Sequence, residues 1–197
     1  MGVSIDKTYF IVGDKLERNK NINQQIVIHN IPNVVKFDAI LSKNFGIIHN
    51  GKFNSGMIGC YISHLSVWKE AIRNGFKYVL VCEDDVSFNL NYQDKLHNCL
   101  ESLPDNFDIA LIGWNQQKEC ISTDINDNWC IPNRWWGTHC YIVNCDNMKS
   151  KISLFERMTN QIDIQICDKQ KQGKINVFAL KNKLSIQSGL RTTVQIC

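Results

Sequence analysis

Three consecutive acidic residues, Glu83, Asp84 and Asp85, are the first candidates for chemistry in this sequence. Adjacent carboxylates repel one another and cannot all be buried without partners, so they require solvent, basic side chains or a divalent cation. The apolar run 78–82 directly precedes them, and it is rich in strand formers and too short for a helix. Because open α/β folds bind ligands at the carboxyl ends of sheet strands, the triplet predicts a ligand or metal site. A solvated acidic turn, or a cap for a following helix, is the alternative for the triplet taken alone.

A helix is predicted to lead into that strand and to position the triplet. Apolar residues recur at three- and four-residue spacing, namely Ile58, Ile62, Leu65, Trp68 and Ile72. Asn74-Gly75 follows them and is expected to end the helix in a left-handed conformation. The strand is continuously apolar, which predicts that both of its faces are covered. The same patterns predict a helix at 92–103 and strands at 107–112 and 175–180.

The order of residues within 56–88 is distinctive. Gly59-Cys60 is followed four residues later by Ser63-His64, and about twenty residues after that by the acidic triplet at a strand end. This combination resembles glycosyltransferase family 25, which includes bacterial lipopolysaccharide galactosyltransferases and collagen galactosyltransferases. The resemblance implies an α/β, GT-A-type fold, Rossmann-like, with a mixed central sheet flanked by helices. It also implies a UDP-sugar donor and a divalent cation, Mn²⁺ or Mg²⁺, held by the acidic motif.

Length and composition describe one globular domain over 1–197. The 197 residues are 44% hydrophobic and 21% charged, which is enough for a proper core. The net charge of +3 is modest and the basic residues are scattered, which argues against nucleic-acid binding. No apolar run reaches the roughly 18–20 residues of a membrane span, and no signal peptide is recognisable. Peripheral contact with a membrane stays open.

The nine cysteines include no Cys-x-x-Cys pair, and several fall at apolar positions where free cysteine acts as a small hydrophobe. A reducing compartment, and hence a cytoplasmic location, is therefore expected. A zinc site built from Cys120, Cys130, His139 and Cys140 was considered, but its spacing matches no familiar ligand pattern.

The N-terminal region supplies candidate donor-binding residues. Residues 9–12 predict the first strand, a polar helix carrying Arg18 follows, and 26–28 predict a second short strand. In the family, the first strand usually ends in Asn-Leu-Asp, with an Arg a few residues later, and forms part of the nucleotide pocket. Residues 11–13 replace that motif here with Ile-Val-Gly, so Asp14 is expected to take over the polar role beside Arg18. A solvated helix residue is the alternative for Arg18.

His64 and Gln187 complete the predicted nucleotide-sugar site. The Ser63-His64 pair is interpreted as holding the acidic strand end in place, whereas a hydrogen-bonded core histidine is the alternative. Residues 184–187 resemble the family's closing Leu-Val-x-Gln motif, which ends here at Gln187.

Residues 114–136 show neither helical nor strand periodicity and carry four of the five tryptophans. Long irregular loops are usually functional or disordered, and indole faces are common platforms for sugar rings. We therefore predict that this segment binds the acceptor through Trp114, Trp129, Arg134 and Trp136. The alternative is that Trp135 and Trp136 plug the core.

Candidate bases follow this segment. Residues 137–143 resemble the family's Gly-Thr/Ser-His-Ala-Tyr strand, and Ile162-Asp163 resembles its apolar-Asp pair at a helix start. Between them a single helix is predicted, with its buried stripe at 148, 152, 155 and 158. Family members invert the anomeric carbon, so one base must deprotonate the acceptor hydroxyl. Asp163 is the first candidate and His139 the second, although capping of the helix would equally explain Asp163.

The predicted function is an inverting glycosyltransferase that moves a hexose, galactose or glucose, from a UDP-sugar to a glycan, lipopolysaccharide or glycoprotein hydroxyl. Asp85 is the first predicted metal ligand. Glu83 and Asp84 would complete the shell directly, through water, or by contacting the ribose. Two other classes remain open: a catalytically silent sugar- or nucleotide-binding relative, and a metal-dependent phosphohydrolase.

Overall fold

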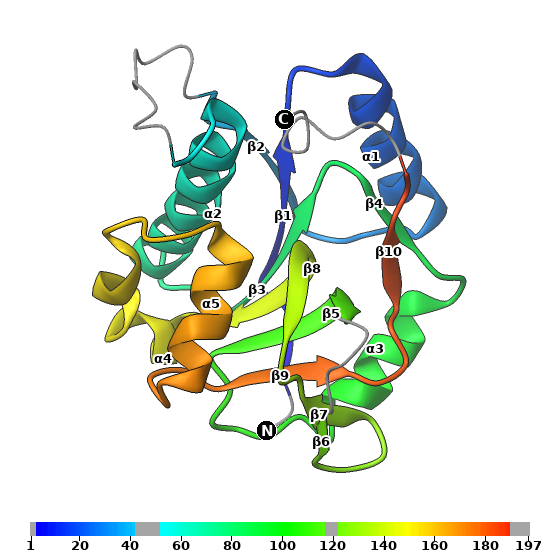
Figure 1. The fold of residues 1–197 in the computed structure, drawn as a ribbon. Coiled ribbons are helices and arrows are strands. Elements are labelled where there is room, and N and C mark those ends of the chain that lie inside the picture. The colour runs from blue at the N-terminus through cyan, green and yellow to red at the C-terminus, as the bar shows by residue number, and fades with distance from the viewer. Residues whose placement is uncertain (1–2, 42–51, 117–121, 190–197) are drawn as a thin grey trace.

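The computed structural model describes residues 3–41, 52–116 and 122–189, which form a mixed sheet with helices on both faces (Figure 1). The strands are β1 Lys7–Val12, β2 Val34–Asp38, β3 Tyr78–Glu83, β4 Val86–Phe88, β5 Ile109–Gln116, β6 Thr123–Asp124, β7 Trp129–Ile131, β8 Trp135–Asn144, β9 Val177–Leu180 and β10 Ser185–Gln187. The helices are α1 Leu16–Ile28, α2 Ser55–Arg73, α3 Tyr92–Leu100, α4 Cys145–Lys149 and α5 Ile162–Lys171, with a 3₁₀ helix at Ile152–Phe155. No helix in these described residues is long and apolar enough to cross a membrane.

The main sheet joins a parallel part to a mixed part. Its strand order is β2-β1-β3-β8-β5-β9-β7-β6. Strands β2 and β3 both run parallel to β1, whereas β8 is antiparallel to its neighbours β3 and β5. The carboxyl ends of β1, β2 and β3 therefore lie at the same edge of the sheet. The strand order reverses at β1, which has β2 on one side and β3 on the other. Open α/β sheets bind ligands at such a point. The predicted α/β class with a mixed central sheet is confirmed.

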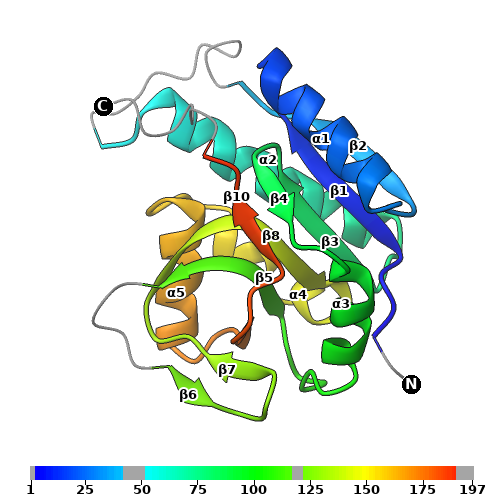
Figure 2. The ribbon, with the colours of Figure 1, turned by 90° about the vertical axis from the view of Figure 1, so that its right-hand side faces the viewer.

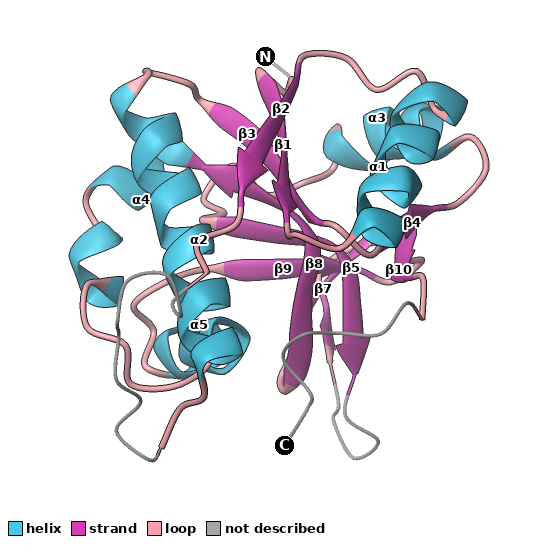
Figure 3. Ribbon diagram, turned by 90° about the horizontal axis from the view of Figure 1, so that it is seen from above, coloured by secondary structure: helices cyan, strands magenta, loops and turns pink. Residues whose placement is uncertain are grey.

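Two apolar clusters cover the two faces of the sheet. Helices α2, α4 and α5 pack on one face, and α1, α3 and the small β4–β10 sheet lie on the other (Figure 3). Strand β3 shows the division, because Val79 and Val81 belong to the first cluster and Leu80 and Cys82 to the second. Period-two alternation explains why a strand between two helical layers is apolar at every position. The prediction that this strand is covered on both faces is confirmed.

Helix α2 begins and ends as predicted, but a different stripe is buried. The Asn54 side chain caps it by accepting a 2.8 Å hydrogen bond from the Met57 amide, and Gly75 follows its end with a φ of 72°. Of the predicted apolar stripe, Trp68 alone is fully buried, while polar Ser63 and His64 face the core. Their hydrogen bonds explain this rotation, because a buried polar side chain is tolerated once it has partners.

Two predicted elements were wrong. Residues 26–28 are not a strand but the last turn of α1, where Val27 is 78% exposed. The chain stops the helix at Asn30, whose φ of 46° is left-handed, and Ile31 donates back to the Ile26 carbonyl. The predicted single helix over 148–158 is instead α4 followed by the 3₁₀ helix.

The described part of 114–136 is also more regular than predicted. Strand β5 extends to Gln116, β6 and β7 form a hairpin at one end of the sheet, and β8 begins at Trp135 (Figure 2). Register shifts between β5 and β8 interrupt the period of two, which is why the pattern was not visible in the sequence. Residues 117–121 lie outside the described residues.

Candidate active site

A pocket of about 250 Å³ lies at the shared carboxyl edge of β1, β2 and β3. The segments that follow these strands form its walls together with the first turns of α2 and Arg18 of α1. Its lining includes Gly13, Asp14, Lys15, Arg18, Ala39, Ile40, Leu41, Ser55, Gly56, Gly59, Cys60, Ser63, His64, Glu83 and Asp84. The predicted helix and strand therefore meet at one concave site, which Glu83 and Asp84 line, whereas Asp85 is not among its lining residues.

Arg18 neutralises the second and third members of the acidic triplet. Its guanidinium donates through Nη1 to Asp84 and through Nη2 to Asp85 at 3.0 Å, and all three side chains are buried. Asp84 also accepts a 2.9 Å hydrogen bond from the Gly13 amide. The alternative of a solvated Arg18 is therefore wrong, because this side chain connects α1 to the end of β3.

Glycine at position 13 has a steric reason in this arrangement. A Cβ on Gly13 would lie 3.0 Å from the Asp84 carboxylate, which is too close for ordinary contact. The replacement of the family's first-strand motif by Ile-Val-Gly thus lets the backbone approach Asp84 and donate to it. Asp14 is exposed at the pocket's edge, where its predicted role toward a nucleotide remains a prediction.

Asp85 carries the least satisfied carboxylate of the triplet. Its Oδ1 atom is buried and accepts no hydrogen bond from another described residue. Burial raises the pKa of Asp85 to about 7, the charge of Glu83 adds to this rise, and Arg18 opposes it. Three carboxylates with one guanidinium leave a deficit of positive charge. An unpartnered buried oxygen in such a cluster fits a divalent cation, for which carboxylates are suitable ligands.

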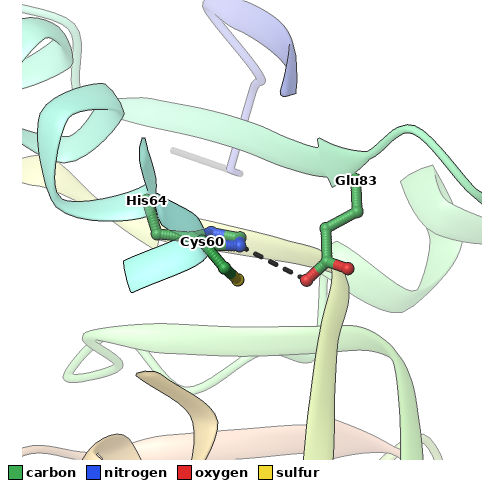
Figure 4. Close-up of side chains that lie close together, drawn as sticks. All are labelled: Cys60, His64 and Glu83. Carbon is green, nitrogen blue, oxygen red and sulfur yellow. Dashed lines mark hydrogen bonds and ion pairs between the residues drawn. The ribbon is translucent and has the colours of Figure 1, made fainter. Parts of the chain in front are cut away.

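Glu83 points to the other side of the strand end, toward α2 (Figure 4). Its Oε1 accepts a 2.7 Å hydrogen bond from Thr138 Oγ1 and lies 3.3 Å from His64 Nε2. Burial raises the pKa of Glu83, but the hydrogen bonds and charge of His64 and the Thr138 hydroxyl outweigh burial and lower that pKa to about 2. Glu83 is therefore an anion throughout the neutral range.

A chain of hydrogen bonds fixes the orientation and tautomer of His64. The Trp68 Nε1–H donates to the Tyr141 hydroxyl at 2.8 Å, and that hydroxyl lies 2.7 Å from His64 Nδ1. Because the ionised Glu83 carboxylate can only accept, its hydrogen bond with His64 requires a hydrogen on Nε2, and the Tyr141 hydroxyl can then donate to Nδ1. His64 then carries its hydrogen on Nε2 and donates it to Glu83. The prediction that His64 holds the acidic strand end is confirmed.

Ser63 has a different task from the one predicted. Its hydroxyl donates to the Gly59 carbonyl at 2.7 Å and accepts from the Ile40 amide at 2.8 Å. Ser63 therefore attaches the segment after β2 to α2 and does not touch the acidic strand end.

Asp163 lies in the first turn of α5, near the triplet but not among the residues that line the pocket. Its Oδ2 accepts a 2.9 Å hydrogen bond from the Gly137 amide, and its Oδ1 accepts from the Ile164 amide. Burial raises the pKa of Asp163, the two amides lower it, and the charge of Glu83 raises it further. The contact with Gly137 joins α5 to β8, so Asp163 has a structural role whatever its role in chemistry.

His139 is enclosed between β8 and the small sheet. Its side chain is 1% exposed, and a Cβ on Gly113 would lie 2.4 Å from its Nε2. Burial lowers the pKa of His139. The Ser185 backbone lies near the ring, yet neither ring nitrogen makes a hydrogen bond of ordinary geometry to a described residue. The structure gives His139 no access to an acceptor, which corrects its prediction as the second candidate base.

Two of the predicted acceptor-binding tryptophans are core residues. Trp114 is 3% exposed and donates to the Leu180 carbonyl, and Trp129 is fully buried and donates to the Cys99 carbonyl. A ring buried in this way cannot stack on a sugar, which corrects that prediction. Trp136 is 45% exposed and Arg134 is exposed beside it, so these two remain candidates.

Gln187 lies on β10, where it is exposed and accepts a hydrogen bond from Asn115. Strand β10 pairs with β4, and the Ser188 amide donates to the Asp85 carbonyl at 2.7 Å. Gln187 therefore lies close to Asp85 in space, because it pairs with Val86 across the small sheet. Its contact with the donor remains a prediction.

The zinc site considered from the sequence does not form from the described residues. Cys130 donates to the Ala179 carbonyl, whereas the Cys140 thiol lies 3.8 Å from that of Cys82, and Cys120 lies outside the described residues. Sequence reasoning missed Thr138, Tyr141 and Cys60 as neighbours of Glu83. The family resemblance included Cys60, Thr138 and Tyr141 in its motifs, but nothing in the sequence paired Tyr141 with His64, which lies 77 residues away.

A scan against protein-family models matches residues 12–166 to glycosyltransferase family 25, described as an LPS biosynthesis protein family. The chain belongs to family 25. The match includes α2, the acidic triplet and Asp163, and it confirms the family resemblance drawn from 56–88.

Curated family 25 relatives match over short segments. Human procollagen galactosyltransferase 2 is 46% identical over 59 residues, which cover 30% of this chain and 9% of that protein. Human inactive glycosyltransferase 25 family member 3 is 42% identical over 48 residues, 24% of this chain and 8% of that protein. A putative glycosyltransferase of Haemophilus influenzae is 32% identical over 91 residues, 41% of this chain and 32% of that protein. The chain thus spans a minor part of these relatives.

Solved structures support the fold of this family 25 chain. A glycosyltransferase involved in the glycosylation of the major capsid of PBCV-1 superposes with a TM-score of 0.52 and 10% identity, covering 94% of each chain. An inositol-1-phosphate CTP transferase from T. maritima gives 0.51 and 12%, covering 95% of this chain and 90% of that chain. At such identities the likeness concerns the fold alone, and the predicted GT-A-type architecture is confirmed.

Proposed function

We propose that this family 25 glycosyltransferase moves a hexose from a UDP-sugar to a hydroxyl of a glycan, lipopolysaccharide or glycoprotein, with inversion at the anomeric carbon. Galactose is the favoured hexose and glucose the second, because the relatives include procollagen galactosyltransferases. The observation that carries the proposal is the pocket at the carboxyl edge of β1–β3, which Glu83 and Asp84 line and which the buried Asp85 directly follows in the chain. Membership of the family favours a transferase over the phosphohydrolase alternative.

The pocket has suitable groups for a nucleotide diphosphate. Lys15 and Arg18 line it, and the N-terminal end of α2, at Ser55 and Gly56, opens onto it. A helix N-terminus carries a partial positive charge that favours phosphate groups. The apolar residues Ile40 and Leu41, which also line the pocket, offer a surface for the base or ribose.

Asp85 is the residue we propose as the principal ligand of a divalent cation, Mn²⁺ or Mg²⁺. Its Oδ1 lacks a partner among the described residues, whereas both oxygens of Asp84 already accept hydrogen bonds. Glu83 and Asp84 support the site by their charge. When bound, such a cation would neutralise the donor pyrophosphate and the departing UDP.

Asp163 is the proposed base and Trp136 the proposed acceptor platform. The raised pKa of Asp163 suits a base near neutral pH, since a base is most effective when its pKa is close to the working pH. Trp136 directly precedes Gly137, whose amide holds the Asp163 carboxylate. A sugar stacked on Trp136 and bonded by Arg134 would therefore bind next to the proposed base.

A second function is favoured by one observation. Arg18 already fills the space between Asp84 and Asp85 with a positive charge, and several relatives are described as inactive. A family member of this kind would bind the donor without transferring its sugar.

Donor binding and transfer separate these functions. We expect UDP-galactose to raise the melting temperature only when Mn²⁺ is present, because a ligand that binds the folded state stabilises it. Asp85→Asn should abolish the shift, and the matched control Asp105→Asn, at an exposed loop position, should retain it. An unchanged shift in Asp85→Asn would remove Asp85 as the ligand, and binding without any transfer would establish the silent alternative.

The acceptor side is tested by comparing tryptophans. Trp136→Ala should fold normally, raise the acceptor KM and leave hydrolysis of the UDP-sugar unchanged. Trp129→Ala, which removes a buried ring, should instead lose about 3–5 kcal/mol of stability. A Trp136→Ala enzyme with the parental acceptor KM would place the acceptor elsewhere.

Finally, we propose that the protein works in a reducing compartment, as the cytoplasm is. The proposal is supported by the cysteines in the described residues, which are all free and mostly buried.

A further inference from the structure

Cys60, His64 and Glu83 bring a sulfur, a nitrogen and an oxygen ligand together at the floor of the pocket (Figure 4). Cys60 and His64 lie one turn apart on α2, so they share a face of that helix, and Glu83 reaches them from the end of β3. The three ligand atoms all lie within 4.8 Å of one another.

The spacing of these atoms suits a tetrahedral ion. Two ligands about 2.0–2.1 Å from zinc, at a tetrahedral angle, are roughly 3.3 Å apart. The observed distance between His64 Nε2 and Glu83 Oε1 is 3.3 Å. All three residues line the pocket, so a fourth position would face its interior.

The residues around the cluster behave as supports for metal ligands. Tyr141 holds the far nitrogen of the His64 ring at 2.7 Å, and Thr138 holds the Glu83 oxygen at 2.7 Å. Such outer contacts orient metal ligands and are worth about 10–100-fold in metal affinity. The carboxylates of Asp84, Asp85 and Asp163 act on the Cys60 thiol through their charges, which makes this region of the pocket attractive to a cation.

We infer that Cys60, His64 and Glu83 form a three-ligand site for a thiophilic divalent cation of the zinc class. Thiolate and imidazole select zinc and similar ions, whereas Mn²⁺ and Mg²⁺ prefer oxygen ligands. The site is therefore distinct from the oxygen site proposed at Asp85, and only Glu83 belongs to both.

Metal binding would exchange the proton carried by His64. The cation takes the position of the hydrogen on Nε2, which moves to Nδ1 of the same ring, and it displaces the hydrogen of Cys60 Sγ, which leaves to solvent as a proton. The hydrogen on Nδ1 is donated to the Tyr141 oxygen, whose two lone pairs can accept from both Trp68 and His64. The Tyr141 hydroxyl hydrogen must then turn away from His64. The metal–ligand bonds have to offset the loss of the hydrogen bond that this hydroxyl donated to Nδ1.

Cobalt titration tests the site, because Co²⁺ substitutes for zinc and reports a bound thiolate by a charge-transfer band. We expect metal-free protein to bind one equivalent of Co²⁺ with such a band. An equimolar amount of Zn²⁺ should abolish the band, whereas excess Mn²⁺ or Mg²⁺ should not. This readout needs no sugar and no activity, so it stands or fails independently of the proposed function.

Matched variants assign the ligands. Cys60→Ser should lose the band and bind zinc at least tenfold more weakly, while Cys99→Ser, at a half-buried position on α3, should keep both properties. Glu83→Gln should keep the band with weaker affinity, and it serves as the second variant if Cys60→Ser does not fold. A missing thiolate band in the parent, a band that persists in Cys60→Ser, or displacement by Mn²⁺ as effective as by Zn²⁺ would each overturn the inference.

Discussion

The carboxylates at the end of β3 have different kinds of partner on the two sides of the strand. On the α2 side, Glu83 contacts the Thr138 hydroxyl and the His64 ring, which is oriented by Tyr141. On the α1 side, Asp84 and Asp85 are held by the charge of Arg18. The pKa of Glu83 falls to about 2 and that of Asp85 rises to about 7, although only one residue lies between them.

At Glu83 the hydrogen bonds and the charge of His64 outweigh burial, whereas at Asp85 burial and the charge of Glu83 outweigh the opposing charge of Arg18. Glu83 has two donors aimed at one oxygen, whereas Asp85 has one cation and leaves its other oxygen without a partner among the described residues. Hydrogen bonds to the charged form favour that form, and burial among like charges disfavours it. The two sides should therefore respond differently when a partner is removed.

Removing Arg18 is expected to have the largest effect. Arg18→Met keeps the apolar stem but leaves Asp84 and Asp85 buried without a cation, which should lower the unfolding free energy by about 3–5 kcal/mol. Urea denaturation in the presence of a chelator measures this loss. The control Arg73→Met, at the exposed end of α2, should change stability by no more than about 0.5 kcal/mol. Equal stability of the two variants would show that the guanidinium is not what holds the aspartates.

The pH dependence of stability should differ between the parent and Asp85→Asn. A folded-state pKa of about 7, raised from 3.8, contributes stability that is complete below pH 4 and is lost as the pH rises through 7. At about 1.4 kcal/mol per pKa unit, the metal-free parent should lose up to about 4 kcal/mol relative to Asp85→Asn over this window.

Thermal melts of both proteins between pH 4 and pH 8, in a chelator, measure this difference. The exposed control Asp105→Asn should follow the parent at every pH. Parallel curves for the parent and Asp85→Asn would mean that Asp85 ionises without penalty and that no cation is needed to balance it.

A smaller loss is expected on the Glu83 side. Tyr141→Phe removes the hydroxyl between Trp68 and His64 and leaves two buried nitrogen atoms without that partner, which should cost about 1–3 kcal/mol. Nitrogen NMR of the His64 ring should also show a changed tautomer population. The control Tyr78→Phe, whose ring stacks on Phe107, should alter neither stability nor the His64 signals. An unchanged His64 spectrum in Tyr141→Phe would show that the tyrosine hydroxyl does not determine the state of the ring that contacts Glu83.

The sequence predicted the parts of this site that depend on local patterns. Helix α2, strand β3 and the triplet could be placed because apolar spacing and turn residues act over a few positions. The partners of the triplet could not be predicted, since Arg18 and Tyr141 lie 66 and 77 residues from the side chains that they contact. No short-range pattern marks such pairs.

The tryptophans illustrate a second limit of sequence reasoning. Trp114 and Trp129 each have an asparagine neighbour in the sequence and are buried, whereas Trp136, between Trp135 and Gly137, is exposed. Their indole N–H groups donate to backbone carbonyls, which lets a polar-looking segment enter the core. The irregular register between β5 and β8 then decides which face each ring takes.

The pairing of β10 with β4 determines when the acidic turn can be completed as the chain folds. The Ser188 amide closes on the Asp85 carbonyl from roughly 100 residues farther along the chain. A contact of this sequence separation forms late, because the loop between its ends must first be ordered. While the chain is being synthesised, the parallel part of the sheet with its acidic edge is complete in sequence long before β10 leaves the ribosome. During that interval the triplet is an open, negatively charged turn, and Arg18, already synthesised, is positioned to hold it.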